Sequence, residues 1–420
     1  MLSSPIIKTL IDGYEFLWCE GKEWVIKAIV TKIIEQPRGA LSAELTIEHE
    51  FTERPPISRV RINLTSQQAR NTIAKRLNDA KIIAGLDSSW LMEQICTEAI
   101  KLHREGEPIR ELWTSEDIQP PEFLLEPILL KDLPTIIFGE KGVTKSNLAL
   151  VFYIILTLPW DDNPLELIAP DRSIKTAILD WELPGNIAQW NLKKLQRGLN
   201  LPPLALYHRR CLSPLADDIE TIQKYLLEIK AEAVIIDSLG RAVGGELLKD
   251  TENVNRFFSA LDKLRVTPLI LAQTSKEGDI KSKKRKSIYG SIFFEYYARS
   301  IFELCKSESI GEDEVSVALF HRSANLTKLE KPMGFRFNFN ENKTEITREA
   351  VSYAEFYEKV SRQLQVTELL KMEPLKTEQI MEALGIRRSN ADVTLKRLRD
   401  KKKIIKLDDG RWGIRTDKMF

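Results

Sequence analysis

The sequence has few of the features that mark secreted, disulfide-bonded or membrane-spanning proteins. Its 420 residues contain four cysteines, which lie far apart and form no Cys-x-x-Cys pair, so neither a disulfide framework nor a zinc site is predicted. The first residues lack the basic segment and apolar core of a secretion signal. The longest apolar run, around 148–160, is shorter than the roughly 20 residues that span a bilayer. We therefore expect a cytoplasmic protein that has no membrane partner.

An excess of charge of one sign is also absent. The 62 Lys and Arg residues nearly balance the 61 Asp and Glu residues, which leaves a net charge of +1 that favours no class of partner. The length and the 43% hydrophobic content predict about two or three domains. We expect an amino-terminal α+β accessory domain over 1–112, an α/β domain over 113–347 and a helical domain over 352–420.

The most specific pattern lies at 135–158. An apolar run at 135–138 predicts a buried strand, and 147–158 predicts a helix. A strand, a glycine-bearing turn and a helix with Lys-Ser at its start form a phosphate-binding loop, in which backbone N–H groups hold anionic oxygens. Lys145 can then reach the β- and γ-phosphates of ATP, and the Ser146 hydroxyl can hold Mg²⁺. The turn consists of Gly139, Glu140, Lys141, Gly142, Val143, Thr144, Lys145, Ser146 and Asn147, and Thr144 replaces the usual glycine.

The region that contains this loop alternates apolar strands with helical segments, which predicts an α/β fold with a largely parallel sheet. Strands are expected at 135–138, 176–180, 204–208, 233–237, 268–272, 300–304 and 315–321. Ligands of such folds lie at the carboxyl ends of strands, and each candidate side chain follows or ends a strand. Glu182 is the expected general base for the attacking water, with Asp180 as the alternative, and Asp237 is the expected Mg²⁺-side carboxylate.

Three further features follow later strands. Gln273 could sense the γ-phosphate, and the next loop, 276–290, carries the basic run 281–286, a nucleic-acid contact or else a solvated loop. Arg322 is a candidate arginine finger for a neighbouring subunit, with Arg299 as its rival and a surface salt bridge as the plain alternative.

As a set, these residues resemble a known group. The strings GEKGVTKS, ILDWE, HRRCLSPLADDIE, VIIDSLGRAVGG, YGSIFFEYYARSIFEL and HRSAN resemble, in order and spacing, RecA-like ATPases of the hexameric RepA/DnaB helicase and KaiC branch, in particular the AAA_25 type. The resemblance covers just over half the chain. It implies a RecA-like core, ATP with Mg²⁺, a homo-oligomer (a hexamer) with shared sites and a DNA-related task. It also implies the roles given above to Lys145, Ser146, Glu182, Asp237 and Arg322.

The flanking regions have patterns of their own. Segments 14–18, 24–35 and 41–50 predict a small antiparallel sheet, followed by helices at 66–81 and 90–104, with no chemical motif. At the other end, helices are expected at 352–370, 377–384 and 391–402, followed by a hairpin around Asp408-Asp409-Gly410. That order resembles a winged helix-turn-helix.

Local charge supports a DNA contact at this end. Residues 385–420 contain twelve Lys and Arg against five Asp and Glu, a net charge of +7. The second helix of this motif enters the major groove by its first residues, so Arg387, Arg388, Ser389 and Asn390 are the expected base-reading side chains. Lys396 and Arg397 are expected to contact phosphates. A protein-binding module is the alternative. The sequence thus predicts a Mg²⁺-dependent ATPase acting on DNA, such as a replicative or mobile-element helicase. The alternatives are an ATP-gated DNA-binding regulator and an assembly factor.

Overall fold

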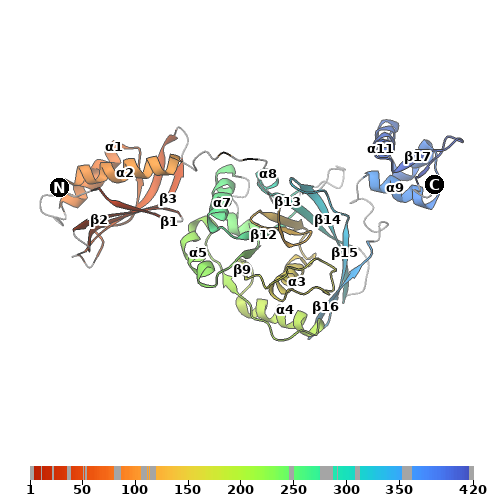
Figure 1. Ribbon diagram of the computed structural model, residues 1–420, viewed down its shortest axis with the longest axis horizontal. Coiled ribbons are helices and arrows are strands. Elements are labelled where there is room, and N and C mark those ends of the chain that lie inside the picture. The colour runs from red at the N-terminus through yellow and green to blue at the C-terminus, as the bar shows by residue number, and fades with distance from the viewer. Residues whose placement is uncertain are drawn as a thin grey trace. The chain divides into compact units, whose positions relative to one another are not determined.

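The structure is a computed structural model that describes residues 4–10, 12–20, 23–35, 39–50, 54–79, 87–105, 120–245, 250–274, 287–290, 292–307, 313–351 and 362–415, with the single residues 52, 111 and 113. The chain divides into two compact units. The first consists of 1–122, 211–234 and 240–268, and the second of 123–210, 235–239 and 269–420. Figure 1 labels many of the helices and strands of both units. The basic run 281–286 lies outside the described residues.

The first unit begins with a five-stranded antiparallel sheet and two helices. The strands, in sheet order, are β1 (Ile6–Leu10), β2 (Gly13–Glu20), β3 (Glu23–Glu35), β4 (Leu41–His49) and β5 (Ile57–Asn63), followed by α1 (Gln67–Asp79) and α2 (Ser88–Glu105). The three predicted strands and both helices are confirmed. The sequence interpretation missed the two edge strands, because β1 and β5 bury few side chains and so show weak apolar alternation.

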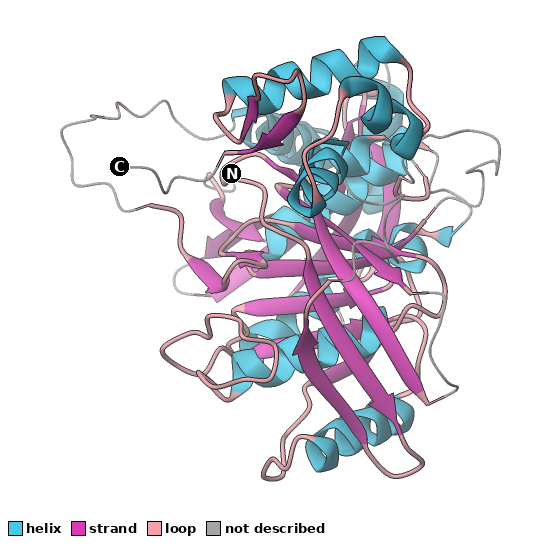
Figure 2. Cartoon of the chain, turned by 90° about the vertical axis from the view of Figure 1, so that its right-hand side faces the viewer, coloured by secondary structure: helices cyan, strands magenta, loops and turns pink. Residues whose placement is uncertain are grey.

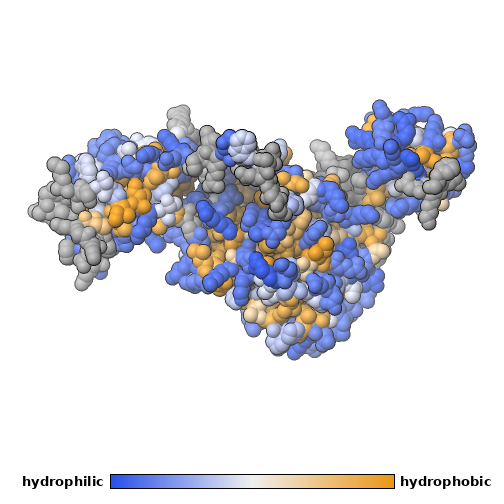
Figure 3. All heavy atoms as spheres, in the orientation of Figure 1, coloured by the Kyte–Doolittle hydropathy of each residue, from blue (hydrophilic) through white to orange (hydrophobic). Residues whose placement is uncertain are grey.

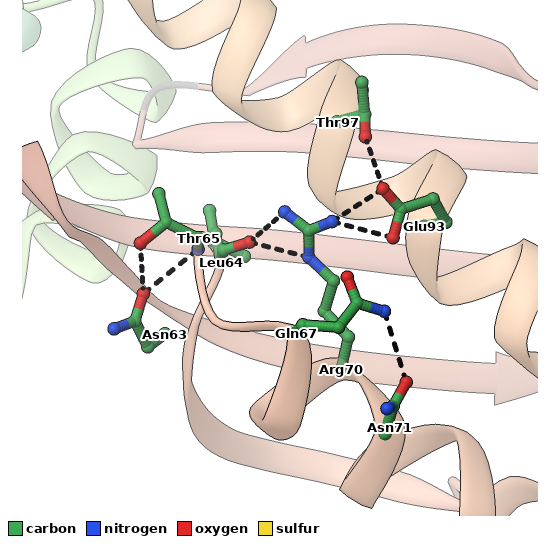
Figure 4. Close-up of polar contacts among 8 residues, drawn as sticks. All are labelled: Asn63, Leu64, Thr65, Gln67, Arg70, Asn71, Glu93 and Thr97. Atoms are coloured by element: carbon green, nitrogen blue, oxygen red, sulfur yellow. Dashed lines mark hydrogen bonds and ion pairs between the residues drawn. The ribbon is translucent and has the colours of Figure 1, made fainter.

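One arginine ties the elements of this α/β layer together. Arg70 of α1 donates to the Leu64 carbonyl after β5 from both Nε and Nη2, at 2.9 and 2.7 Å. Its Nη1 contacts both carboxylate oxygens of Glu93 on α2 at 2.7 Å (Figure 4). The Arg70 side chain is largely buried, whereas that of Glu93 is half exposed. Helix α1 is therefore fixed both to the end of β5 and to α2.

The first unit also contains helices from the middle of the chain. Its members are the 3₁₀ helix η2 (Leu215–Asp217), α5 (Ile219–Glu228) and α7 (Thr251–Leu264), and α7 packs against both of the others. Asp250 caps α7 by accepting the backbone N–H of Glu252, as expected for an aspartate at a helix start. The short helix α6 (Leu239–Val243) follows β11.

The second unit contains the large sheet expected from the sequence. Its strands are β8 (Thr135–Gly139), β9 (Thr176–Asp180), β10 (His208–Arg210), β11 (Ala233–Asp237), β12 (Thr267–Gln273), β13 (Ser300–Lys306), β14 (Glu314–Ala324), β15 (Met333–Phe339) and β16 (Thr344–Glu349). The order across the sheet is β10–β9–β11–β12–β8–β13–β14–β15–β16. The strands appear in magenta in Figure 2. A further pair, β6 (Phe123–Leu125) and β7 (Leu129–Leu130), precedes them.

The sheet has a parallel part and an antiparallel part. The pairs β10–β9, β12–β8 and β8–β13 are parallel, whereas β14, β15 and β16 continue the sheet as an antiparallel meander. The sequence interpretation did not include β15 and β16. It also predicted the strand that corresponds to β10 at 204–208, which was wrong by several residues. The strand begins only at His208, because the Ala205 carbonyl and the Tyr207 N–H before it bond to the Tyr153 hydroxyl instead of to a strand.

Helices α3 (Lys145–Thr157) and α4 (Gly185–Gly198) follow β8 and β9. All residues of α3 from Leu148 to Leu156 are buried, so this apolar segment is a core helix. Helix α8 (Phe293–Tyr297) precedes β13. No helix among the described residues is long and apolar enough to cross a membrane.

A buried histidine lies in the antiparallel part of the sheet. His321 of β14 stacks on the Phe302 ring, and its Nδ1 accepts the Glu330 backbone N–H at 3.1 Å. Its Nε2 lies 3.0 Å from the Ser300 hydroxyl. Because Nδ1 is an acceptor, Nε2 carries the proton of the neutral ring. Burial lowers the pKa of His321.

The second unit ends in three helices and a hairpin. These are α9 (Arg362–Met372), α10 (Thr377–Leu384), α11 (Arg388–Asp400), β17 (Ile404–Lys406) and β18 (Trp412–Ile414). The predicted bounds of α10 are confirmed, and Gly385 ends it in the left-handed conformation. Helix α11 begins three residues before the predicted start, and the residues 352–361 of the first predicted helix lie outside the description. Side chains of all three helices and the hairpin share one core, which includes Val366, Ile380, Leu395 and Trp412.

Candidate nucleotide-binding site

The turn between β8 and α3 has the backbone of a phosphate-binding loop. Gly142 has φ +82°, and Thr144 lies in the left-handed region at φ 64°, ψ 20°. Threonine adopts this conformation at a cost of about 1–2 kcal/mol, which a glycine would avoid. The replacement of glycine by Thr144 therefore keeps a glycine-like conformation. At the start of the turn a Cβ on Gly139 would meet the Leu304 carbonyl oxygen at 2.4 Å, so that position requires glycine.

Lys145, the first residue of α3, points its ammonium group back into the loop. Nζ donates to the carbonyls of Gly139 and Glu140 at 2.8 and 2.7 Å. Burial lowers the pKa of Lys145 to about 8, while the negative charges of Asp237 and Glu182 act in the opposite direction. The predicted cation thus lies inside the loop and close to two of the predicted acids.

The next residue joins the loop to a second strand. The Ser146 hydroxyl donates to Asp237 Oδ2 at 2.6 Å, although 91 residues separate the two along the chain. Asp237 ends β11 and is buried. Burial raises its pKa to about 6, and the Ser146 hydrogen bond and Lys145 oppose that rise. The pair that the sequence assigned to Mg²⁺ is therefore brought together by the fold.

The two acids at the end of β9 have different environments. Asp180 is buried and its Oδ1 accepts the backbone N–H groups of Glu182 and Leu183, both at 2.7 Å. Its Oδ2 lies 3.3 Å from His208 Nε2 on β10. Glu182 is exposed, and its Oε1 accepts the Ser238 hydroxyl at 2.5 Å. Asp180 is thus occupied in shaping the turn, whereas Glu182 has a carboxylate that solvent reaches.

Polar and apolar groups of these elements enclose a small cavity. Ser146, Asp180 and Asp237 are among its polar lining residues, and Leu150, Ile178 and Ile235 are among its apolar ones. Gln273 ends β12 next to this region, because its partner in the parallel ladder is Gly139, the first residue of the loop. The exposed Gln273 side chain therefore stands beside the phosphate loop, as expected from its position after the strand.

The two arginine candidates lie elsewhere. Arg322 is in β14, which runs antiparallel to β13. The carboxyl end of β14 therefore lies at the end of the sheet where the parallel strands begin, opposite to the end that carries the loop. Its guanidinium does not project past the sheet but binds the Glu303 carboxylate at 2.6 and 2.8 Å and covers the Phe320 ring. Arg299 is exposed and precedes β13 at that same end of the sheet. Neither arginine meets the loop of its own chain.

The polar residues proposed for DNA lie on the surface of the carboxyl-terminal helices. Arg387 precedes α11, Arg388, Ser389 and Asn390 form its first turn, and Lys396 and Arg397 lie further along; all six are exposed. Hydrophilic side chains dominate this part of the molecule in Figure 3. Arg388 also lies 3.4 Å from Glu378 of α10, an exposed pair.

A phosphate loop, a hydrogen-bonded Ser–Asp pair and an acid just after the adjacent strand define the class of P-loop nucleotide-hydrolysing proteins. Residues 104–279 match the family model described as AAA domain, which supports the same conclusion: the central part of the chain is a P-loop ATPase domain. No curated protein matches the sequence. Among solved structures, a KaiC-like protein from the hyperthermophilic archaeon Pyrococcus horikoshii OT3 is similar, at 16% identity, a TM-score of 0.37, and coverage of 58% of this chain and 100% of that one.

Two contributors to the site were missed at the sequence level. His208 lies beside Asp180, and Arg210 Nη1 donates to the Glu182 carbonyl at 2.8 Å. Both belong to the short strand β10, which pairs with β9 in register from His208 to Arg210. The polar run at 208–210 could have indicated these residues, because polar side chains at a strand end face the ligand side of such a sheet. It was overlooked because the strand was predicted at 204–208.

Proposed function

We propose that this protein is a Mg²⁺-dependent ATPase that acts on DNA as a homo-oligomer of hexameric type. The observation that carries the hydrolytic part is the meeting of Lys145, Ser146, Asp237 and Glu182 from three elements at one edge of the sheet. Residues 139–147 would surround the phosphates of ATP. A phosphate-binding loop with its lysine, a Ser–Asp pair for the metal and a carboxylate that can orient water are the parts that phosphoryl transfer to water uses.

The side chains present fit a magnesium ion. The Ser146 hydroxyl and the Asp237 carboxylate are hard oxygen donors in mutual contact at 2.6 Å. Magnesium ordinarily takes one or two protein oxygens, with phosphate and water oxygens completing the octahedron. When bound, the ion would neutralise charge on the β- and γ-phosphates. Ser146 and Asp237 are the residues that would hold it.

The remaining residues would act on the water and on the phosphates. Glu182 would orient a water and accept its proton. As the water oxygen bonds to the γ-phosphorus, the bond from that phosphorus to the bridging oxygen breaks, and its electron pair leaves with ADP. Lys145 would exchange its carbonyl partners for phosphate oxygens, and Gln273 would report the γ-phosphate. Arg322 would act as an arginine finger on a neighbouring subunit only after its pair with Glu303 opens.

DNA binding is assigned to the carboxyl-terminal helices and hairpin. We interpret α10, α11 and the hairpin β17–β18 as a winged helix-turn-helix, with Arg387 to Asn390 reading bases and Lys396 and Arg397 contacting phosphates. The exposure of all six side chains supports this assignment. A steep decrease of binding with salt is expected. A salt-independent interaction would instead indicate an assembly factor that binds protein.

The decisive experiment measures ATP turnover with no DNA, with single-stranded DNA and with duplex DNA, for the wild type and for Lys145→Ala. We expect turnover that DNA stimulates and that the substitution abolishes. A helicase, whether replicative or from a mobile element, would also unwind a tailed duplex when ATP is present. Turnover that is equal in the two proteins would refute the assignment of the site.

A second candidate function is an ATP-gated DNA-binding regulator. The left-handed Thr144 and the amide of Gln273 favour it, because a strained loop and a neutral sensor can retain ATP without rapid hydrolysis. For this function we expect tight ATP binding, a footprint on a particular duplex sequence and no unwinding. Replacing Thr144 with glycine would then raise turnover.

A further inference from the structure

Ser238 directly follows Asp237 and contacts a different acid. Its hydroxyl donates to Glu182 Oε1 at 2.5 Å, across 56 residues of sequence. Ser238 is 5% exposed, whereas Glu182 is exposed to solvent. An exposed glutamate ordinarily exchanges among many side-chain rotamers, and holding it in one costs entropy. A buried hydroxyl therefore restrains a carboxylate that would otherwise rotate freely.

The backbone of the same turn is held by other groups. Asp180 accepts the N–H groups of Glu182 and Leu183, and Arg210 donates to the Glu182 carbonyl. These bonds fix where the Glu182 Cα lies but leave its side-chain torsions free. The bond from Ser238 acts on the side chain itself, so the two sets of contacts have separate effects.

We propose that Ser238 is a positioning residue for Glu182, an inference that rests on the proposed ATPase function. The hydroxyl occupies one carboxylate oxygen and so directs the second oxygen towards the attacking water. Asp237 and Ser238 are consecutive residues: the first binds Ser146 of the phosphate loop and the second binds Glu182. One stretch of backbone at the end of β11 thereby sets the distance between the Ser146–Asp237 pair, which would hold the metal, and Glu182, the proposed general base.

The test is a double-mutant cycle in the full-length protein, with Ser238→Ala and Glu182→Gln singly and together. A hydrogen bond to a charged group corresponds to roughly a ten- to hundredfold change, so Ser238→Ala should lower kcat by about that factor. The KM for ATP should change by less than about twofold, because the Ser238 hydroxyl donates to Glu182 and the loop residues are unchanged. In the Glu182→Gln background, Ser238→Ala should change kcat no further.

Three more variants separate positioning from packing. Ser238→Thr retains a hydroxyl and should recover most of the turnover. A cysteine at position 238 is similar in size to serine, but its thiol is only a weak donor. Ser238→Cys should therefore lower kcat as Ser238→Ala does, and it tests the hydroxyl even if Ser238→Ala destabilises the fold. Ser300→Ala is the matched control, because it also removes a buried hydroxyl contact, the one to His321, and should leave kcat unchanged.

Each result bears on the inference. Equal losses from Ser238→Ala in both backgrounds, or full turnover in Ser238→Cys, would show that the hydroxyl does not act through Glu182. Such a result leaves the ATPase function intact, provided that the wild type turns over ATP and Lys145→Ala does not. Absence of turnover in the wild type would overturn the ATPase function and the role of Ser238 with it.

Discussion

The two acids that follow β9 should fail in different ways when each is replaced. Asp180 is 3% exposed and accepts two backbone N–H groups at 2.7 Å. Hydrogen bonds to an ionised group contribute about 1.5–3 kcal/mol each, and the freed N–H groups of the exposed turn regain some water. We therefore expect Asp180→Ala to lower the free energy of unfolding by about 3 kcal/mol. In a unit of this size that corresponds to a decrease in Tm of about 6–12 °C.

Glu182→Gln should do the opposite. The side chain is exposed, and an amide oxygen can still accept the Ser238 hydroxyl, so the change in stability should stay below about 0.5 kcal/mol. Turnover should fall by about 10²–10⁴-fold to a small residual rate, because an amide cannot take the water proton. ATP binding should persist, since Lys145 and Ser146 are untouched.

The assay combines thermal unfolding of the full-length protein with steady-state ATP turnover. Hydrogen exchange of peptides from β9 and β11 assigns the transition to the sheet that holds the acids. The reasoning is refuted if Asp180→Ala melts at the temperature of the wild type, or if Glu182→Gln melts early while its turnover stays at the wild-type rate. The first result would contradict the structural role given to Asp180, and the second would contradict the catalytic role given to Glu182.

Three other predictions concern groups outside the site. Arg70→Ala should destabilise the amino-terminal α/β layer by about 2–4 kcal/mol in denaturant unfolding followed by exchange of β2–β4 peptides, whereas Glu93→Ala, which removes a half-exposed partner, should cost less than about 1 kcal/mol. Burial lowers the pKa of His321, so the unfolded chain binds more protons; stability should fall as pH decreases below about 6.5, and His321→Gln should flatten that dependence. Burial raises the pKa of Cys96 to about 11, so iodoacetamide at pH 8 should modify it only after unfolding, as mass spectrometry would show.

The elements with strong local signals were predictable. Strands ending at Asp180 and Asp237 were placed correctly because four consecutive apolar or β-branched residues end at an aspartate in each. Helix α10 was placed correctly because Gly385 ends it. The phosphate loop could be recognised because its chemistry depends on residues that are adjacent in sequence.

Weakly amphipathic elements were not predictable. Strand β1 exposes four of its five side chains, so its pairing with β2 leaves little trace in the sequence. Strand β15 was missed although Phe335, Phe337 and Phe339 alternate with polar residues; its place beyond β14, and that of β16 after it, is a long-range choice that this pattern does not encode. The place of Arg322 was likewise hidden, since its strand direction follows from pairing and not from composition.

The sequence by itself determined the chemistry that is local: a loop that binds phosphate, acids after buried strands and a basic carboxyl-terminal region. It named Glu182 as the expected general base but left Asp180 open as the alternative, because the two lie only two positions apart at the end of one strand. Only the tertiary structure distinguishes the environments of the two acids, by burying Asp180 against backbone N–H groups and placing the Ser238 hydroxyl beside Glu182. Roles that depend on burial and on partners distant in sequence exist only once the chain has folded, because solvent exposure is a property of the packed molecule.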